Sequence, residues 1–238
     1  MSEYLVFQLY APLVSWGTQA VGQERPTEDH PGRSALLGLL AASLGIDRSD
    51  DDQHQALSTA CKFGMKLYAQ GLTLRDFHTA QVPPTIRATR HLYTRRDELR
   101  ESKLGTILSF RSYQQDSLSI VAVVSQNDQF SARKLQSALQ TPHFQLYLGR
   151  KSCPLSVCLN PQLSEAKSLK EALDTYPIGE ELQPLKMLEN PRYYWERMDD
   201  TGLTADYHVP RYDQPISRQR WQFGSRDEYV SLGDQSCT

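Results

Sequence analysis

Three short stretches of the sequence place cations beside glycine, serine or aromatic residues, a combination that suits binding to phosphate. The first is Gly32-Arg33-Ser34, which begins the best predicted helix, with Arg25 in the loop before it. Free backbone N–H groups and the helix dipole favour an anion at such a position. We therefore expect these residues to contact phosphates of a nucleic acid. The alternative is that Ser34 only caps the helix and Arg33 points into water.

The second stretch runs from residue 87 to residue 111 and mixes cations with aromatic residues. Arginines beside aromatic rings suit single-stranded nucleic acid, because phosphates take the charge and bases stack for roughly 1–3 kcal/mol each. A solvated basic loop is the plainer alternative. The residues expected to bind RNA here are Arg87, Arg90, His91, Tyr93, Arg95, Arg96, Lys103 and Arg111.

The third stretch is Gly149-Arg150-Lys151, which follows a predicted strand, "FQLYLG", and precedes Pro154. Glycine lets a backbone or a phosphate approach closely, and the two cations then lie at the end of the strand. These three residues are predicted to bind RNA. A plain charged sheet edge would look the same in the sequence.

Catalytic residues are not predicted, although candidates exist. The motifs G-x-x-x-x-G-K-[ST], G-x-S-x-G and H-E-x-x-H are absent, which leaves nucleotide hydrolysis and zinc-peptidase chemistry without support. Metal-free RNA cleavage needs a general base such as His, Tyr or Lys to activate a 2′-OH. The candidates for that role are His78, His91 and His143, with Lys103 or Tyr93 as partners.

Composition sets further limits. The four cysteines, Cys61, Cys153, Cys158 and Cys237, form no C-x-x-C pair, so neither a disulfide framework nor a metal site is predicted, and no cofactor is expected. The formal charge of -2 excludes binding to nucleic acid by overall charge alone. The start "MSEYLVFQLY" lacks the cations of a secretory signal, and no apolar run approaches the roughly 18 residues of a membrane span. We expect a cytoplasmic protein without a membrane partner.

The elements that must position these residues alternate between strands and helices. Ser34 is the expected N-cap of the main helix, and Gly45 suits its C-terminal end. Leu135 and Leu139 are expected to face inward from a second amphipathic helix. In chain order we predict a strand at 4–10, helices at 34–44 and 50–60, a strand at 62–68, an extended insertion at about 75–113, a buried strand at 117–124, a helix at 129–140 and a strand at 144–149.

This order is that of a ferredoxin-like split βαβ domain, so we predict an α+β fold. Residues 1–150 would form that domain with the insertion as an extended thumb, and residues 151–238 a smaller C-terminal β-rich subdomain. The loop before the first helix, the insertion and the end of the last strand can converge beside one sheet edge in such a fold. The three basic stretches would then line one groove.

Five segments resemble, in order, the Cas5 family of CRISPR-associated proteins, most closely the Cas5e members of type I-E Cascade complexes. The segments are "YLVFQLYAPLVSWG", "RPTEDHPGRSALLGLLAASLGIDR", "LRDFHT", "LYLGRKSCPLS" and "RWQFGSRDEYV". Residues from about 160 to 214 match this family poorly. The resemblance implies a RAMP-type fold with a thumb and a small C-terminal β subdomain.

The resemblance also implies a role. Such a subunit holds the 5′ handle of the crRNA at one end of the complex, next to the Cas7 backbone and the large Cas8 subunit, and meets target DNA only through the complex. A separate endonuclease cuts the precursor in type I-E systems, so a non-catalytic binder is expected. Two alternatives stay open: a metal-independent endoribonuclease, as in type I-C systems, and a scaffold that binds only proteins.

Overall fold

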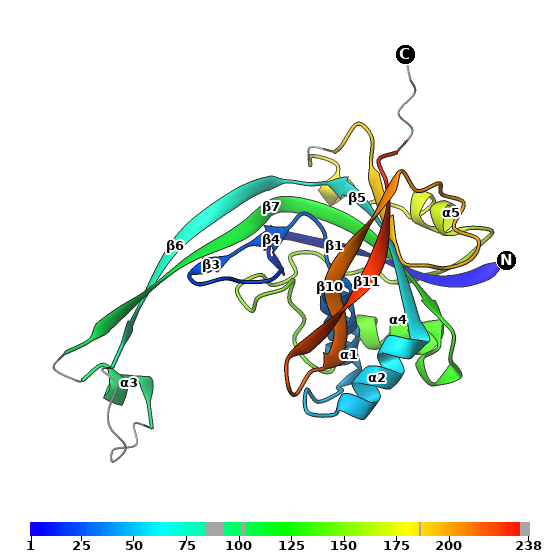
Figure 1. Cartoon of the computed structure of the whole chain (residues 1–238). Coiled ribbons are helices and arrows are strands. Elements are labelled where there is room, and N and C mark those ends of the chain that lie inside the picture. The colour runs from blue at the N-terminus through cyan, green and yellow to red at the C-terminus, as the bar shows by residue number, and fades with distance from the viewer. Residues whose placement is uncertain (84–92, 101–102, 186, 234–238) are drawn as a thin grey trace.

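The computed structural model describes residues 1–83, 93–100, 103–185 and 187–233, and it shows a curved sheet with helices packed against it (Figure 1). The helical elements are α1 (Arg33–Leu44), α2 (Asp51–Ala60), α3 (Arg95–Glu98), η1 (Asp128–Phe130), α4 (Ala132–Gln140), α5 (Leu169–Asp174) and η2 (Glu180–Leu182). The strands are β1 (Ser2–Val14), β2 (Trp16–Gly17), β3 (Glu24–Arg25), β4 (Thr27–Glu28), β5 (Cys61–Ala69), β6 (Leu72–Val82), β7 (Gly105–Ser125), β8 (Gln162–Ala166), β9 (Arg192–Trp195), β10 (Tyr207–Ser217) and β11 (Gln222–Ser231).

The main sheet has the order β10-β11-β9-β5-β7-β1-β8, and its neighbours along this path are antiparallel. Its centre is β1, β5 and β7, whose apolar runs are buried on both faces as inner strands require. The α+β class predicted from the sequence is confirmed. The order β8-β1-β7-β5, with α1 between β1 and β5 and α4 between β7 and β8, fits the β-α-β-β-α-β sequence of a ferredoxin-like fold.

The predicted strand at 144–149 is wrong. That segment makes only an isolated bridge between Tyr147 and Pro154, because the chain turns back at Gly149. The strand beside β1 is instead β8, at 162–166. The sequence pattern indicated a strand because Leu146 and Leu148 alternate with polar residues and are buried, but they pack into the core from a loop.

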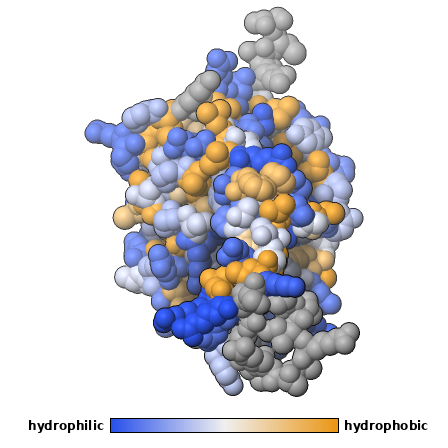
Figure 2. Space-filling view, turned by 90° about the vertical axis from the view of Figure 1, so that its left-hand side faces the viewer, coloured by the Kyte–Doolittle hydropathy of each residue, from blue (hydrophilic) through white to orange (hydrophobic). Residues whose placement is uncertain are grey.

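The predicted insertion is a long two-stranded arm. The strand β6 pairs with the first half of β7 from Leu72–Gln115 to Val82–Gly105, and this ribbon extends away from the rest of the molecule (Figure 1). The second half of β7 continues into the centre of the sheet. Figure 2 views this side of the molecule and shows hydrophobic residues interspersed with hydrophilic ones. Several apolar side chains of the arm are exposed: Leu72, Leu74, Phe77, Ile107 and Leu108.

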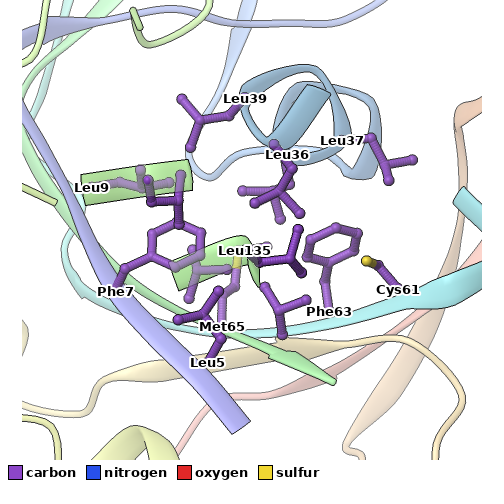
Figure 3. Close-up of a cluster of buried hydrophobic side chains, with 14 of the residues drawn as sticks. Leu5, Phe7, Leu9, Leu36, Leu37, Leu39, Cys61, Phe63, Met65 and Leu135 are labelled. Carbon is purple, nitrogen blue, oxygen red and sulfur yellow. The ribbon is translucent and has the colours of Figure 1, made fainter. Parts of the chain in front are cut away.

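Two cores lie on the two sides of the sheet. On one side, Phe7 and Leu9 of β1 meet Leu36 of α1, Phe63 of β5 and Leu135 of α4 (Figure 3). On the other side, even-numbered residues of β7 such as Ile120 pack against α5. This alternation is the expected consequence of the two-residue period of a strand. As predicted, Leu135 and Leu139 of α4 face inward.

The main helix ends as predicted but begins differently. Gly45 adopts the left-handed conformation, with φ of 76°, which suits glycine at this position. Its N-cap is Gly32, not Ser34, and no side chain caps it locally. The prediction for Ser34 was wrong because a carboxylate distant in the sequence supplies the cap.

The proposed boundary at residue 150 stays a prediction. The described strands after it extend the same sheet at both ends, since β8 pairs with β1 and β9 pairs with β5. The hairpin of β10 and β11 forms the far end and lies over α1 and α2 (Figure 1).

Candidate nucleic-acid interface

Arg33 is buried and engaged within the chain, with 6% of its surface exposed. Its Nη1 donates to Glu196, and its Nη2 donates to the carbonyl oxygens of Ser58 and Cys61. The guanidinium also lies 5.4 Å from the Phe63 ring centroid. A buried cation with these partners is not available to an external phosphate. The expectation that Arg33 binds RNA is therefore replaced by a structural role.

The N-terminus of α1 already holds an anion supplied by the protein itself. The backbone N–H of Arg33 donates to Asp213 Oδ2 at 2.7 Å, and Arg226 forms a two-pronged pair with the same carboxylate. The carbonyl of Ser34 accepts a hydrogen bond from Arg218. Helix dipole chemistry thus operates as predicted, but its anion is a side chain of β10. The Ser34 side chain is half-buried, and its contact with RNA stays a prediction.

The loop before α1 is fixed by a buried histidine. His30 lies between Asp29 and Glu228, with its ring nitrogens 2.5 and 2.9 Å from their carboxylates, and stacks on Tyr194 with centroids 3.7 Å apart. Burial alone would lower the pKa of His30, but the two carboxylates raise it above its ordinary value. Burial alone would raise the pKa of Glu228, but His30 and nearby arginines lower it to about 2. This clamp joins the loop to β11.

The turn that carries Gly149, Arg150 and Lys151 docks against the end of β1. Gly149 has φ of 87°, and a Cβ atom there would lie 1.8 Å from the Ser15 carbonyl oxygen. The Ser15 N–H in turn donates to the Leu148 carbonyl at 3.2 Å. Glycine therefore serves a close approach, as predicted, but what approaches is the protein backbone rather than a phosphate.

Four predicted cations meet at the base of the arm, where β3, β7 and this turn come together. Arg25 is paired with Arg111 in the parallel ladder of β3 and β7. Arg150 donates to the Arg25 carbonyl oxygen at 3.3 Å, and Lys151 follows Arg150. Within the part of the chain that the structure describes, the Arg111 and Lys151 side chains have no ion pair. We call Arg25, Arg111, Arg150 and Lys151 the base cluster.

The remaining predicted residues that the structure describes lie at the far end of the arm, in and around α3 (Figure 1). The strand rise of about 3.4 Å per residue puts Gly105, where β7 begins, roughly 20 Å from Arg111. Near this end are Tyr93, which is 88% exposed, and Arg95, Arg96 and Lys103. Arg95 pairs with Glu98 and donates to the Gln81 carbonyl. The predicted contacts Arg87, Arg90 and His91 lie outside the described residues. The described cations that stay available for RNA thus form two separated groups rather than one groove, and Arg33 belongs to neither group.

Apart from Tyr93, the aromatic residues of the arm were not among the predicted contacts. Phe77 and Phe110 lie side by side with ring centroids 5.2 Å apart, and the Arg75 guanidinium lies 4.1 Å from the Phe110 centroid. Tyr113 lies beneath Arg150 at 4.8 Å. Phe77 is opposite Phe110 in the register of β6 and β7, a pairing that could not be predicted without assigning strands within the insertion.

The candidate general bases that the structure describes do not lie together. His78 is on the arm, 3.6 Å from Asp76, whereas His143 contacts the C-terminal end of α1 and meets the Phe144 ring edge-to-face. Lys103 lies at the far end of the arm, and His91 is outside the described residues. Among the described residues no group of three His, Cys, Asp or Glu side chains could hold a metal ion. No helix of the described chain is long and apolar enough to cross a membrane.

Comparisons with known proteins identify the family. The model of the family "CRISPR-associated protein (Cas_Cas5)" matches residues 4–229. The "CRISPR system Cascade subunit CasD" of Escherichia coli (strain K12) is 30% identical over 243 residues, which cover 98% of this chain and 97% of the relative.

Solved structures give the same result. A chain of a "CRISPR RNA-guided surveillance complex" superposes with a TM-score of 0.67 at 25% identity, covering 97% of this chain and 90% of the other. A "Crystal structure of Cas protein" gives a TM-score of 0.60 at 25% identity, with 96% and 94% covered. Since sequence and fold match over nearly the whole length, this chain belongs to the Cas5 family of CRISPR-associated proteins.

Proposed function

We propose that this protein is the crRNA-binding subunit of a type I-E-like Cascade complex, where it holds the 5′ handle of the crRNA and caps the Cas7 backbone. The observation that carries the proposal is the base cluster at the root of the arm, where Arg150 packs on the Tyr113 ring and where, among the described residues, Arg111 and Lys151 have no ion pair. Cations next to aromatic rings are the groups that single-stranded RNA requires. The family and the relative's name, "Cascade subunit", support the same role.

The arm supports a position at the end of an assembly. A two-stranded ribbon exposed on both faces is only marginally stable by itself in water. A neighbouring subunit could bury the exposed apolar residues of the arm, which would stabilise it. RNA phosphates could contact the cations at its far end. The proposed neighbours are the Cas7 backbone subunit and the large Cas8 subunit, and target DNA meets this subunit only through the complex. The described C-terminal strands are a candidate surface for the large subunit.

We propose a non-catalytic role because the candidate bases His78 and His143 are on different parts of the fold and, among the described residues, no contact joins them. General base catalysis needs the base within about 3 Å of the proton that it removes, or one water away. An endoribonuclease, and a scaffold that binds only proteins, are the alternatives that the experiment must separate.

The test is to mix the purified protein with a 5′-labelled repeat RNA in EDTA and to score bound and cleaved fractions on one gel. Intact RNA that shifts only when the 5′-handle sequence is present supports the proposal. Discrete cleavage that is lost when the nucleotide 5′ of the break is 2′-deoxy would favour the endoribonuclease. A protein that assembles with its partner subunits equally well without RNA, and shifts no RNA, would favour the scaffold.

A further inference from the structure

The side chain of Arg150 bridges segments that are far apart in the sequence. From the turn that follows Leu148 it reaches the base of the arm, where its Cζ lies 4.8 Å from the Tyr113 ring centroid. Its Nη2 also donates to the Arg25 carbonyl oxygen at 3.3 Å, across 125 positions of sequence. A single guanidinium therefore connects the turn, β7 and β3.

The backbone from which this side chain projects is held in place. Cys153 N–H donates to the Arg150 carbonyl at 2.8 Å, and Leu148 N–H donates to the Cys153 carbonyl at 2.8 Å. Gly149 lies so close to Ser15 that no larger residue fits without movement. The guanidinium is thus presented to Tyr113 and Arg25 from a well-defined turn.

One edge of the guanidinium is directed into the protein, although the residue as a whole is half-buried. Its Nη1 is fully enclosed and has no hydrogen-bond partner among the described residues, and Tyr113 beneath it is 8% exposed. A phosphate oxygen would have to displace this packing to reach Nη1. Lys151, by contrast, is exposed, and neither Lys151 nor Arg111 has an ion pair in the described chain.

We propose that Arg150 is a positioning residue, which holds β3 against β7 and so fixes the places of Arg111 and Lys151, the groups that contact RNA phosphates. This inference rests on the proposed function, because it concerns how that RNA surface is organised. Holding β3 in place also keeps the Phe110 N–H on the Gln23 carbonyl, a bond of 2.9 Å beside the cluster.

Lysine cannot replace arginine in such a role. The planar guanidinium stacks on Tyr113 while one of its nitrogens donates sideways to Arg25, whereas an ammonium is a compact, strongly hydrated point charge. At a simple phosphate contact, Arg150→Lys would retain the charge and much of the affinity. If Arg150 is a positioning residue, Arg150→Lys should lose as much RNA affinity as Arg150→Ala.

The first measurement needs no RNA. Hydrogen exchange of the Phe110 amide is compared in the wild type, Arg150→Ala, Arg150→Lys and Lys151→Ala, with Arg133→Ala on the exposed side of α4 as a matched arginine control. We expect about tenfold faster exchange in both Arg150 variants and no change in the other two. Unchanged Phe110 exchange in the Arg150 variants would overturn the inference, whatever happens with RNA.

The second measurement is a double-mutant cycle on affinity for the handle RNA. Lys151→Ala should lower the slope of log affinity against log salt by about 0.7 in the wild type, the value for one contact with a single strand. In the Arg150→Lys background the same change should have little further effect, because Lys151 is no longer positioned. A different result would identify Arg150 as a direct phosphate ligand. In that case Arg150→Lys would keep most of the affinity, and Lys151→Ala would lower the slope by the same amount in both backgrounds. A wild-type protein that binds no RNA contradicts the proposed function. The exchange measurement would still show whether Arg150 holds β3 against β7.

Discussion

At the scale of single residues, several residues that the sequence suggested as RNA contacts instead contact other parts of the same chain. Arg33 is a buried partner of Glu196, and Gly149 accommodates the Ser15 carbonyl. Arg33 and Gly149 lie where the sequence suggested a ligand, and each uses the predicted chemistry toward another part of the same chain. The residues that we propose for RNA are Arg111 and Lys151, which have no ion pair among the described residues.

Gly149→Ala should destabilise the protein. The positive φ disfavours any residue with a Cβ, and the added carbon would meet the Ser15 oxygen at 1.8 Å, so the turn must shift. We expect a loss of at least about 1 kcal/mol in the free energy of unfolding, measured by urea denaturation. Gly17→Ala, at a glycine with open space around its Cβ position, is the control and should change stability less.

The clamp around His30 predicts two effects of pH on stability. Because the folded pKa of His30 is raised above 6.5, its contribution is fully present below pH 6.5 and is lost as the pH rises through the folded value. Because the folded pKa of Glu228 is about 2, against 4.5 unfolded, its contribution is present above pH 4.5 and is lost as the pH falls toward 2.

Urea midpoints measured from pH 5 to pH 9 check the histidine effect. His30→Asn should be less stable than the wild type at pH 6, and its midpoint should change less between pH 6 and pH 9. His208→Asn, at an exposed position of β10, should leave the pH profile as it is in the wild type. Parallel profiles of His30→Asn and the wild type would contradict the assignment of the pH effect to the clamp.

At the scale of elements, a carboxylate joins α1 to the hairpin of β10 and β11. Asp213 accepts from the N–H of Arg33 at the start of the helix and pairs with Arg226 across the hairpin. The pKa of Arg226 is raised because Asp213 and Glu228 outweigh the effect of its burial. The carboxylates of Asp213 and Glu228 therefore offset the unfavourable burial of the Arg226 charge.

Asp213→Ala should therefore be among the most destabilising single changes at this junction. Removing one partner of a largely buried pair costs about 3–5 kcal/mol, and we expect a loss near the lower end because Arg226 keeps its second pair, with Glu228. Thermal and urea unfolding measure the loss. Asp227→Ala, an exposed neighbour of Arg226, is the control. Similar small losses in both variants would show that the junction does not depend on this pair.

At the scale of the whole molecule, a protein with a formal charge of -2 carries an arm that ends in cations and a base cluster that contains four. Nucleic-acid binding then depends on these local groups, not on the overall charge. The separation of roughly 20 Å along the arm also lets the two groups engage different parts of an assembly.

The double substitution Arg111→Ala, Lys151→Ala tests this dependence. It should lower the slope of log affinity against log salt by about 1.4, two single-strand contacts, without changing the urea midpoint, because neither side chain has an ion pair in the described chain. Filter binding between 50 and 300 mM salt measures the slope. Arg133→Ala combined with Lys134→Ala on α4 removes the same charge elsewhere, and an equal effect of that control would mean that overall charge matters after all.

The sequence by itself determined the local structure and the family. Helix periodicity, the C-terminal Gly45 and the inward Leu135 and Leu139 were predictable because they depend on neighbours within a few positions. The family was recognisable from ordered motifs. Tertiary structure decided which cations are free, because the partners of Arg33 lie at Ser58, Glu196 and Asp213, up to 180 positions away. A charged residue contacts RNA or stays within the protein according to such distant partners, and no local pattern in the sequence specifies them.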